Sequence, residues 1–357
     1  MRAKNRYGGY RGRRTGRDML KYLIIALAVL AAVLAGILFA GRDRLAKPEQ
    51  SSDPGQEQSQ LPAQPQPESR PEQEPAPEAE PEPVPEEPEF MAAVGIEAAQ
   101  VLDGSWRSHM QAMGGNAVVV NVKPDGEALG WASEHPDALR VGASSQQSGI
   151  NERLRAMNEA EDVYTVARMS CFRDELLANT YDYCIHSNSG YRWKDFGGVH
   201  WVSPAHEGVQ DYLVALAVEL AQLGFDEILL DNCGYPQDGS GEMGWIKRGD
   251  VYDLQNLDKV ISAFLNKVRT AVEPYGTVVS VCTNAVVIQA EDTARTGLSG
   301  AVLESCADRI WISEIDTAAP LAEMLSDVGV SNVGHRLVTQ SSAIFPGQSW
   351  DRAVLLF

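Results

Sequence analysis

Cysteine is scarce in this chain, with five among 357 residues, and common metal-binding motifs are missing. No two cysteines form a CxxC pair, and the six histidines show neither HxH nor HExxH spacing. A zinc site of the usual ligand spacing is therefore not expected. The first predicted strand is not followed by a GxGxxG loop, which disfavours a dinucleotide-binding sheet. We predict no metal and no cofactor.

Positive charge is also in short supply. Lysine and arginine number 30 against 49 acidic residues, which gives a formal net charge of −19. The region 90–357 holds 18 of the basic and 35 of the acidic residues. A domain this acidic offers no basic patch for a phosphate backbone, so we expect no nucleic-acid partner.

One long apolar run occurs, at residues 22–40, where 19 residues carry no charge. That length suffices for one membrane-spanning helix and exceeds the apolar core of a cleaved signal peptide. The basic tail at residues 1–21 is expected to stay in the cytoplasm, because positive charge is retained on that side. We therefore predict a single-pass cell-membrane protein with an uncleaved anchor, whose remaining chain lies outside the cytoplasm.

Residues 41–89 are dominated by proline, glutamate and glutamine. Such a segment cannot bury enough apolar surface to offset the conformational entropy that folding would cost. We expect a disordered linker here. The remaining region, residues 90–357, is close to the length of one α/β barrel, which is about 250 residues.

Eight short apolar segments rich in β-branched residues alternate with helical patterns in this region. They span residues 91–98, 117–123, 163–170, 227–231, 277–283, 308–313, 336–341 and 353–357. Apolar strands separated by helices are typical of a parallel sheet that is buried on both faces. We predict a (β/α)8 TIM barrel, with an open doubly wound sheet as the competing α/β fold.

Carboxylates follow several of these strands, where a barrel places its active site. Asp231 ends the fourth strand before a turn closed by Pro236, which makes it the first catalytic candidate; capping of that turn is the structural alternative. Glu314 follows the sixth strand and is the candidate general acid. Asp125 and Asp174 follow the second and third strands as reserve carboxylates. Two carboxylates around one bond are what most glycoside hydrolysis uses.

Cationic and aromatic side chains accompany the carboxylates. Lys123 and Arg168 are expected to orient Asp231 and keep it ionised. Flat aromatic faces can stack on sugar rings, although ordinary packing is the alternative for each ring. The predicted substrate-binding residues are Lys123, Arg168, Tyr191, Trp193, His200, Trp201, Asn232, Tyr235 and Asn284.

Three stretches carry a resemblance to a known family: NAVVVNVKPDGEALGW, YTVARMSCFRDELLAN and GYRWKDFGGVHWVSPAHEGVQDYLVALAVELAQLGFDEILLDNCGYP. Together they resemble the putative glycoside hydrolase domain of bacterial surface proteins, a TIM-barrel family distantly similar to the α-amylase superfamily. The resemblance implies that Asp231 stands at the position of the strand-four nucleophile. The fifth strand ends in TNA, so the carboxylic acid that the superfamily places there is missing.

The sequence thus predicts a membrane-anchored, extracytoplasmic glycoside hydrolase that cleaves an external or cell-wall polysaccharide with two carboxylates. A carbohydrate-binding barrel without catalysis is the alternative, because the strand-five acid is missing. A surface scaffold would explain the linker but not the aromatic loops.

Overall fold

The computed structural model describes residues 91–237, 245–247, 249, 252–289, 295–312, 318–340 and 354–355. The predicted basic tail, membrane anchor and linker lie outside these residues, and so does Glu314. Within the described ranges, no helix combines the length and the apolar character that crossing a membrane requires. The described residues all fall within one compact unit, Pro81–Phe357.

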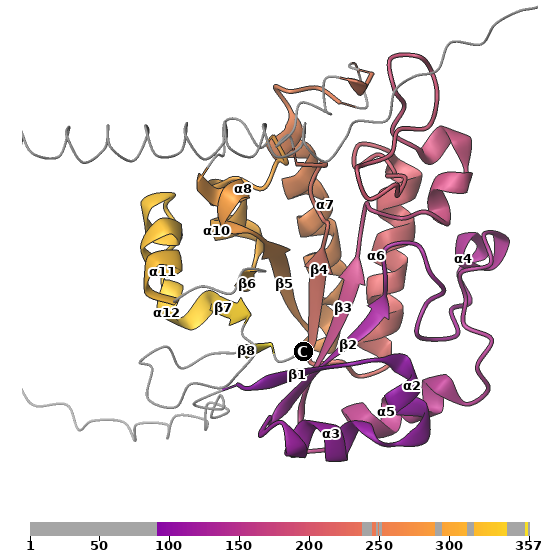
Figure 1. The fold of residues 1–357 in the computed structure, drawn as a ribbon, viewed down its shortest axis with the longest axis vertical. Helices are drawn as coiled ribbons and strands as arrows, with labels where there is room; N and C mark the ends of the chain where they lie inside the picture. The colour runs from indigo at the N-terminus through magenta and orange to yellow at the C-terminus, as the bar shows by residue number, and fades with distance from the viewer. Residues whose placement is uncertain are drawn as a thin grey trace, which may run out of the picture. The chain divides into compact units, whose positions relative to one another are not determined.

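Eight parallel strands form one sheet in which each strand pairs with the next along the chain. They are β1 (Ala93–Ile96), β2 (Ala117–Lys123), β3 (Tyr164–Ser170), β4 (Glu227–Asp231), β5 (Val278–Thr283), β6 (Arg309–Ile312), β7 (Leu337–Gln340) and β8 (Val354–Leu355). Each predicted strand segment contains one of them. The sheet curls so that β1 and β8 come into contact (Figure 1), an α/β arrangement consistent with a TIM-like barrel.

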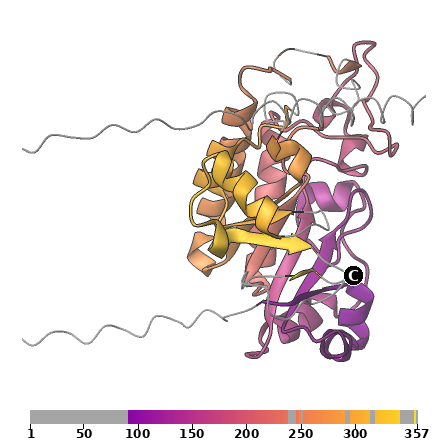
Figure 2. The ribbon, with the colours of Figure 1, turned by 60° about the vertical axis from the view of Figure 1, so that its left-hand side comes forward.

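Helices connect the strands and cover the outer face of the sheet (Figures 1 and 2). The two longest, α6 (Glu207–Gln222) and α7 (Leu257–Val272), pack against each other beside β4 and β5. Helix α7 buries Ile261, Phe264 and Val268, which lie three and four residues apart on one face. The shorter α-helices are α2 (Ala98–Asp103), α3 (Trp106–Ala112), α4 (Pro136–Arg140), α5 (Ile150–Asn158), α8 (Ala285–Gln289), α10 (Gly300–Cys306), α11 (Ala318–Asp327) and α12 (Val333–Arg336). Single 3-10 turns are η2 (Leu177–Asn179), η3 (Tyr181–Tyr183) and η5 (Glu273–Tyr275).

Two apolar cores flank the sheet. The larger core lies between the strands and the covering helices, and it takes alternate strand residues such as Val118 and Ile228. The smaller core lies inside the curled sheet and takes the residues between them, including Val119, Leu229 and Trp311. Burial on both faces explains why the strands read as continuous apolar runs in the sequence.

Polar side chains fill the interior at the N-terminal ends of the strands. Glu227, the first residue of β4, is fully buried there and forms an ion pair with Arg309 of β6. Tyr164 of β3 donates its hydroxyl to Glu227 Oε2 at 3.1 Å, and Trp311 Nε1 donates to Glu227 Oε1 at 2.8 Å. Three strands are therefore joined by one buried carboxylate at the end opposite the predicted site.

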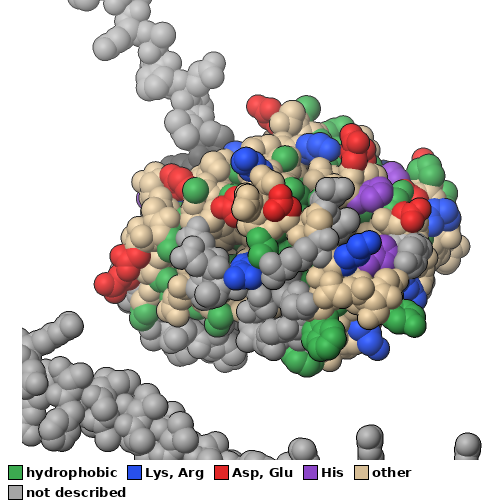
Figure 3. Space-filling model, turned by 90° about the horizontal axis from the view of Figure 1, so that it is seen from above, with side chains coloured by type: hydrophobic (Ala, Val, Ile, Leu, Met, Phe, Trp, Pro, Cys, Tyr) green, Lys and Arg blue, Asp and Glu red, His purple; other side chains and the backbone are tan. Residues whose placement is uncertain are grey.

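The connection from β3 to α6 contains a small antiparallel unit, residues 183–203, which we call the cap. Isolated bridges fold it on itself, among them the pair Lys194 and His200. Arg173, just after β3, pairs with Trp201 and ties the cap to the strand end. The cap therefore lies beyond the arrowheads of the sheet in Figure 1. Figure 3 looks onto this face, where acidic, basic and apolar side chains are interspersed.

Candidate functional site

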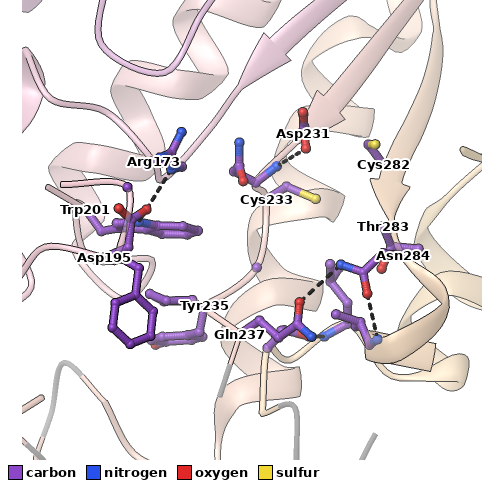
Figure 4. Close-up of a pocket in the computed structure, with 18 of the residues that line it drawn as sticks. Arg173, Asp195, Trp201, Asp231, Cys233, Tyr235, Gln237, Cys282, Thr283 and Asn284 are labelled. Carbon is purple, nitrogen blue, oxygen red and sulfur yellow. Dashed lines mark hydrogen bonds and ion pairs between the residues drawn. The ribbon is translucent and has the colours of Figure 1, made fainter. Parts of the chain in front are cut away.

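Asp231 ends β4 and lines a cavity of about 480 Å³ at the mouth of the sheet (Figure 4). The strand is buried up to this residue, whose own side chain is 18% exposed. The backbone is thereby fixed while the carboxylate reaches the cavity. The cap, the turn after β4 and the segment after β5 supply most of the other lining residues.

Asn232 connects Asp231 to a second carboxylate. Its backbone N–H donates to Asp231 Oδ1 at 2.7 Å, and its φ of 47° lies in the left-handed region that asparagine tolerates. Its side-chain amide donates to Asp125 Oδ1 at 3.1 Å and to Ser170 Oγ at 3.0 Å. We expected Asn232 to bind substrate, but its amide hydrogens are engaged within the site.

Arg168 lies on β3 and forms an ion pair with Asp231. Its Nη1 also donates to Asn121 Oδ1 on β2 at 2.9 Å, which fixes the guanidinium from the other side. Burial disfavours the charge of Arg168, but Asp231 and other nearby negative groups raise its pKa above the ordinary value. The arginine is therefore a permanent cation placed against the Asp231 carboxylate.

Lys123 and Asp174 form a separate ion pair, with 2.8 Å between Lys123 Nζ and Asp174 Oδ2. The two side chains are 2% and 5% exposed, and Lys123 Nζ also donates to the backbone oxygen of Ser170 at 2.6 Å. The structure corrects two expectations here. Lys123 pairs with Asp174 and not with Asp231, because a buried ammonium group needs a carboxylate partner close by. Burial also keeps Asp174 away from a substrate.

Arg173 joins this network to the cap, a role that the sequence analysis missed. It forms an ion pair with Asp125, and its Nε donates to Asp195 Oδ2 at 2.7 Å. Trp201 Nε1 donates to the same oxygen at 2.9 Å. Burial raises the pKa of Asp195, but these hydrogen bonds outweigh burial and hold the pKa below its ordinary value. Asp195 is therefore a carboxylate at neutral pH, and its place between tryptophans was the sequence signal for it.

The aromatic residues of the mouth differ in exposure. Trp193, Trp201 and Tyr235 line the cavity, but they are only 5%, 7% and 3% exposed. Tyr191 is 76% exposed and is not among the lining residues. Phe196, which the sequence analysis did not select, lines the cavity and is 79% exposed. The three buried rings thus build the wall of the cavity, as the packing alternative anticipated.

His200 and Asn284 have different surroundings. His200 Nδ1 lies 2.8 Å from Glu175 Oε1, and its backbone N–H donates to Glu175 Oε2 at 2.8 Å. Burial opposes ionisation of Glu175, but these bonds hold its pKa below the ordinary value. Asn284 lines the cavity, where its Nδ2 donates to Gln237 Oε1 at 3.2 Å (Figure 4). Asn284 is therefore placed to meet a ligand, whereas His200 serves its pair with Glu175.

Two cysteines, Cys233 and Cys282, also line the cavity near Asp231. Both are free and buried, as are the other three cysteines. Burial raises the pKa of Cys282 well above its ordinary value, and the charge of Asp231 adds to this shift. The thiols are therefore neutral and weakly nucleophilic. In the part of the chain that the structure describes, no group of three or more His, Cys, Asp or Glu side chains could hold a metal ion.

The sequence matches one family model, described as a putative glycosyl hydrolase domain, over residues 105–311. No curated protein shows a significant match. Among solved structures, a hypothetical protein from Ruminiclostridium thermocellum ATCC 27405 aligns with 53% of this chain and 96% of its own length, at 22% identity and a TM-score of 0.45. The PgaB (BpsB) glycoside hydrolase domain from Bordetella bronchiseptica aligns with 70% of this chain and 84% of its own, at 14% identity and a TM-score of 0.49.

Proposed function

Because this chain belongs to the family of putative glycosyl hydrolase domains, matched over residues 105–311, we propose that it hydrolyses glycosidic bonds in a polysaccharide. The curled sheet would then be a TIM barrel with its active site at the C-terminal strand ends. The observation that supports this most is the Asp231 carboxylate, held by Arg168 and Asn232 at the edge of a cavity. A carboxylate so placed suits attack on an anomeric carbon or activation of water.

In this proposal Asp231 is the nucleophile or the general base. Its Oδ2 faces Arg168, and its Oδ1 accepts the Asn232 N–H, so the side chain has one orientation and keeps lone pairs for the reaction. Glu314, which follows β6, is proposed as the general acid. Asp125, joined to Asp231 through Asn232, is the substitute if Glu314 does not serve.

The first test replaces Asp231 with Asn, which keeps the shape and removes the charge. Release of reducing ends from a polysaccharide should fall by about a thousandfold or more, while binding of that polysaccharide persists. Asp162→Asn is the matched control, because this exposed carboxylate forms only a surface ion pair with Arg107. Activity that survives in Asp231→Asn would return Asp231 to the turn-capping role.

A second test separates the acid from the nucleophile by the leaving group of the substrate. A general acid protonates the departing oxygen, so its loss matters most for poor leaving groups. Glu314→Gln should therefore slow a polysaccharide far more than an aryl glycoside with an acidic phenol. Asp231→Asn should slow both. If Asp125→Asn shows the selective loss and Glu314→Gln does not, Asp125 takes the acid role.

A carbohydrate-binding barrel without catalysis is the second candidate. Two observations favour it: Asp125 is held in an ion pair by Arg173, and Asp195 is kept ionised by its donors. Asp195 is therefore not suited to act as a general acid, and the Asp125 carboxylate is already engaged by a cation. A chain that binds polysaccharide tightly and releases no reducing ends, with Asp231→Asn indistinguishable from wild type, would support this candidate.

We also propose that the domain works outside the cytoplasm. The uncharged run 22–40 would anchor it in the cell membrane, and the Pro/Glu-rich linker 41–89 would hold it away from the surface. The substrate would then be an external or cell-wall polysaccharide. Protease added to intact cells should remove the domain if this orientation is right, and a domain protected until lysis would contradict it.

A further inference from the structure

Several aromatic side chains line the cavity, but among the described lining residues one of them is largely exposed. Trp193, Trp201 and Tyr235 are almost fully buried, so their ring faces are already covered by protein. Phe196 is 79% exposed at the same cavity. Because this ring lies at the cavity and is not covered by protein, its apolar face is available to a ligand, and burying that face would favour binding.

The turn that carries Phe196 is closed by backbone hydrogen bonds. The backbone of Asp195 exchanges hydrogen bonds with the turn, since its N–H donates to Val199 O at 3.0 Å and its oxygen accepts Gly198 N–H at 2.9 Å. The next residue, Gly197, packs on Arg173 so closely that an added Cβ would lie 2.7 Å from Arg173 Nη2. Phe196 therefore lies in a turn closed by backbone hydrogen bonds, next to Asp195 in the chain and close to Arg173.

The charges at the cavity favour an uncharged ligand. Among the described lining residues the basic side chain is Arg173, and it is neutralised by both Asp125 and Asp195. Asp195, whose pKa is held below its ordinary value, lines the same cavity, and so does Asp231, which forms an ion pair with Arg168. A uronate or sulfate group entering here would meet like charge and, among the described lining residues, no cation without a carboxylate partner, which is unfavourable in a partly buried site.

We propose that Phe196 is the platform on which a sugar ring of an uncharged glycan stacks, while Asp195 accepts and Arg173 donates hydrogen bonds to its hydroxyl groups. This inference deepens the proposed function and rests on it. The Phe196 ring packs against the apolar C–H face of the sugar, and Asp195 and Arg173 form hydrogen bonds with the hydroxyl groups at its edge. It assigns to Phe196 the stacking role that the sequence favoured for Trp193 and Trp201.

The test measures binding of the full chain to four probes: a soluble β-glucan, a galactomannan, chitohexaose and polygalacturonate. The wild type should bind at least one of the three neutral probes more tightly than polygalacturonate. Phe196→Ala should weaken that binding about tenfold, which is equivalent to about 1.4 kcal/mol and near the upper end of what an aromatic contact contributes. Phe196→Trp should retain it. Tyr275→Ala is the matched control, since this aromatic residue is also exposed but does not line the cavity.

A kinetic readout distinguishes binding from general damage. If a bound probe is cleaved, Phe196→Ala should raise KM and leave kcat nearly unchanged. Phe196→Ala binding that equals Tyr275→Ala binding would overturn the inference, and so would preference for polygalacturonate or binding to none of the neutral probes. Binding that depends on Phe196 without any cleavage would keep this inference and remove the hydrolase assignment.

Discussion

At the scale of single residues, Asn232 carries much of the geometry around Asp231. Its backbone N–H fixes one oxygen of Asp231, and its amide reaches Asp125 and Ser170 on neighbouring strands. These contacts require the left-handed φ of 47°. Most side chains are strained in that conformation, so the residue type is restricted by the backbone and by the hydrogen bonds together.

Two substitutions at Asn232 separate these contributions. Asn232→Gly removes the side-chain hydrogen bonds, each worth about 1 kcal/mol, but suits the left-handed backbone. Asn232→Ala removes the same bonds and adds strain of about 1 kcal/mol. We expect the alanine variant to be the less stable of the two by about that difference. Urea unfolding followed by tryptophan fluorescence measures it, and equal stabilities would mean that the backbone conformation is not maintained.

At the scale of elements, β4 carries two inward-facing carboxylates with opposite surroundings. Glu227 begins the strand fully buried among Tyr164, Arg309 and Trp311, whereas Asp231 ends it at the cavity. Parallel barrels place stability at the N-terminal strand ends and chemistry at the C-terminal ends. One strand of five residues therefore connects the structural end of the fold to the candidate site.

Glu227→Gln should destabilise the fold strongly. The substitution leaves Arg309 partly buried without its counter-charge, and breaking a buried pair from one side costs about 3 to 5 kcal/mol. Adding Arg309→Met should recover part of that loss, because no unpaired charge then remains. Asp211→Asn, which touches an exposed ion pair with Lys267, should change the free energy of unfolding by less than about 1 kcal/mol. A Glu227→Gln variant as stable as this control would contradict the structural role.

The cap should loosen in acid, because its link to the sheet depends on an ionised Asp195. The pKa of Asp195 is lowered below 3.8 in the folded protein by donors from Arg173 and Trp201, against the effect of burial. Ionised Asp195 therefore stabilises the folded protein fully above pH 3.8. This stabilisation is lost as the pH falls through the lower pKa that Asp195 has in the folded state. Tryptophan fluorescence should report a transition in that acid range. Asp195→Asn should lack this component, and an unchanged transition would contradict the assignment.

At the scale of the whole molecule, the described strands and helices belong to one compact unit. Residues Pro81–Phe357 form this unit. The eight strands within it pair in the sheet in the same order in which they occur along the chain. Contact between β1 and β8 means that both ends of the region contribute to the same sheet. The fold should therefore depend on residues 90–357 and not on the segments before them.

Deletion of residues 1–89 should leave a soluble domain with the same melting temperature as the full-length protein. Calorimetry of both forms checks this, with the full-length protein held in detergent. Truncation at residue 98 is the matched comparison, because it removes β1 and leaves the edge of β2 without its hydrogen-bonded neighbour. A melting temperature lowered by the first deletion would show that the linker or the anchor stabilises the domain.

The strand order and the position of Asp231 could be predicted, but much of the site around it could not. Strand ends are visible in sequence, which is why Asp231 and Arg168 were selected together. Phe196 was missed because exposure is a property of packing, and a phenylalanine beside Trp193 and Trp201 looks like one more core residue. The correction for the tryptophans has the same origin, since the burial of their rings also depends on packing.

The sequence by itself determined the alternation of eight apolar strands with helices and the place of Asp231 at a strand end, because periodicity and chain order reside in neighbouring residues. Only the tertiary structure decided which charges meet. Lys123 could have paired with Asp231, but the curl of the sheet and the loop after β3 bring Asp174 to it instead. Such pairings join residues far apart in the chain, and their energies depend on distance and burial, which no local pattern records.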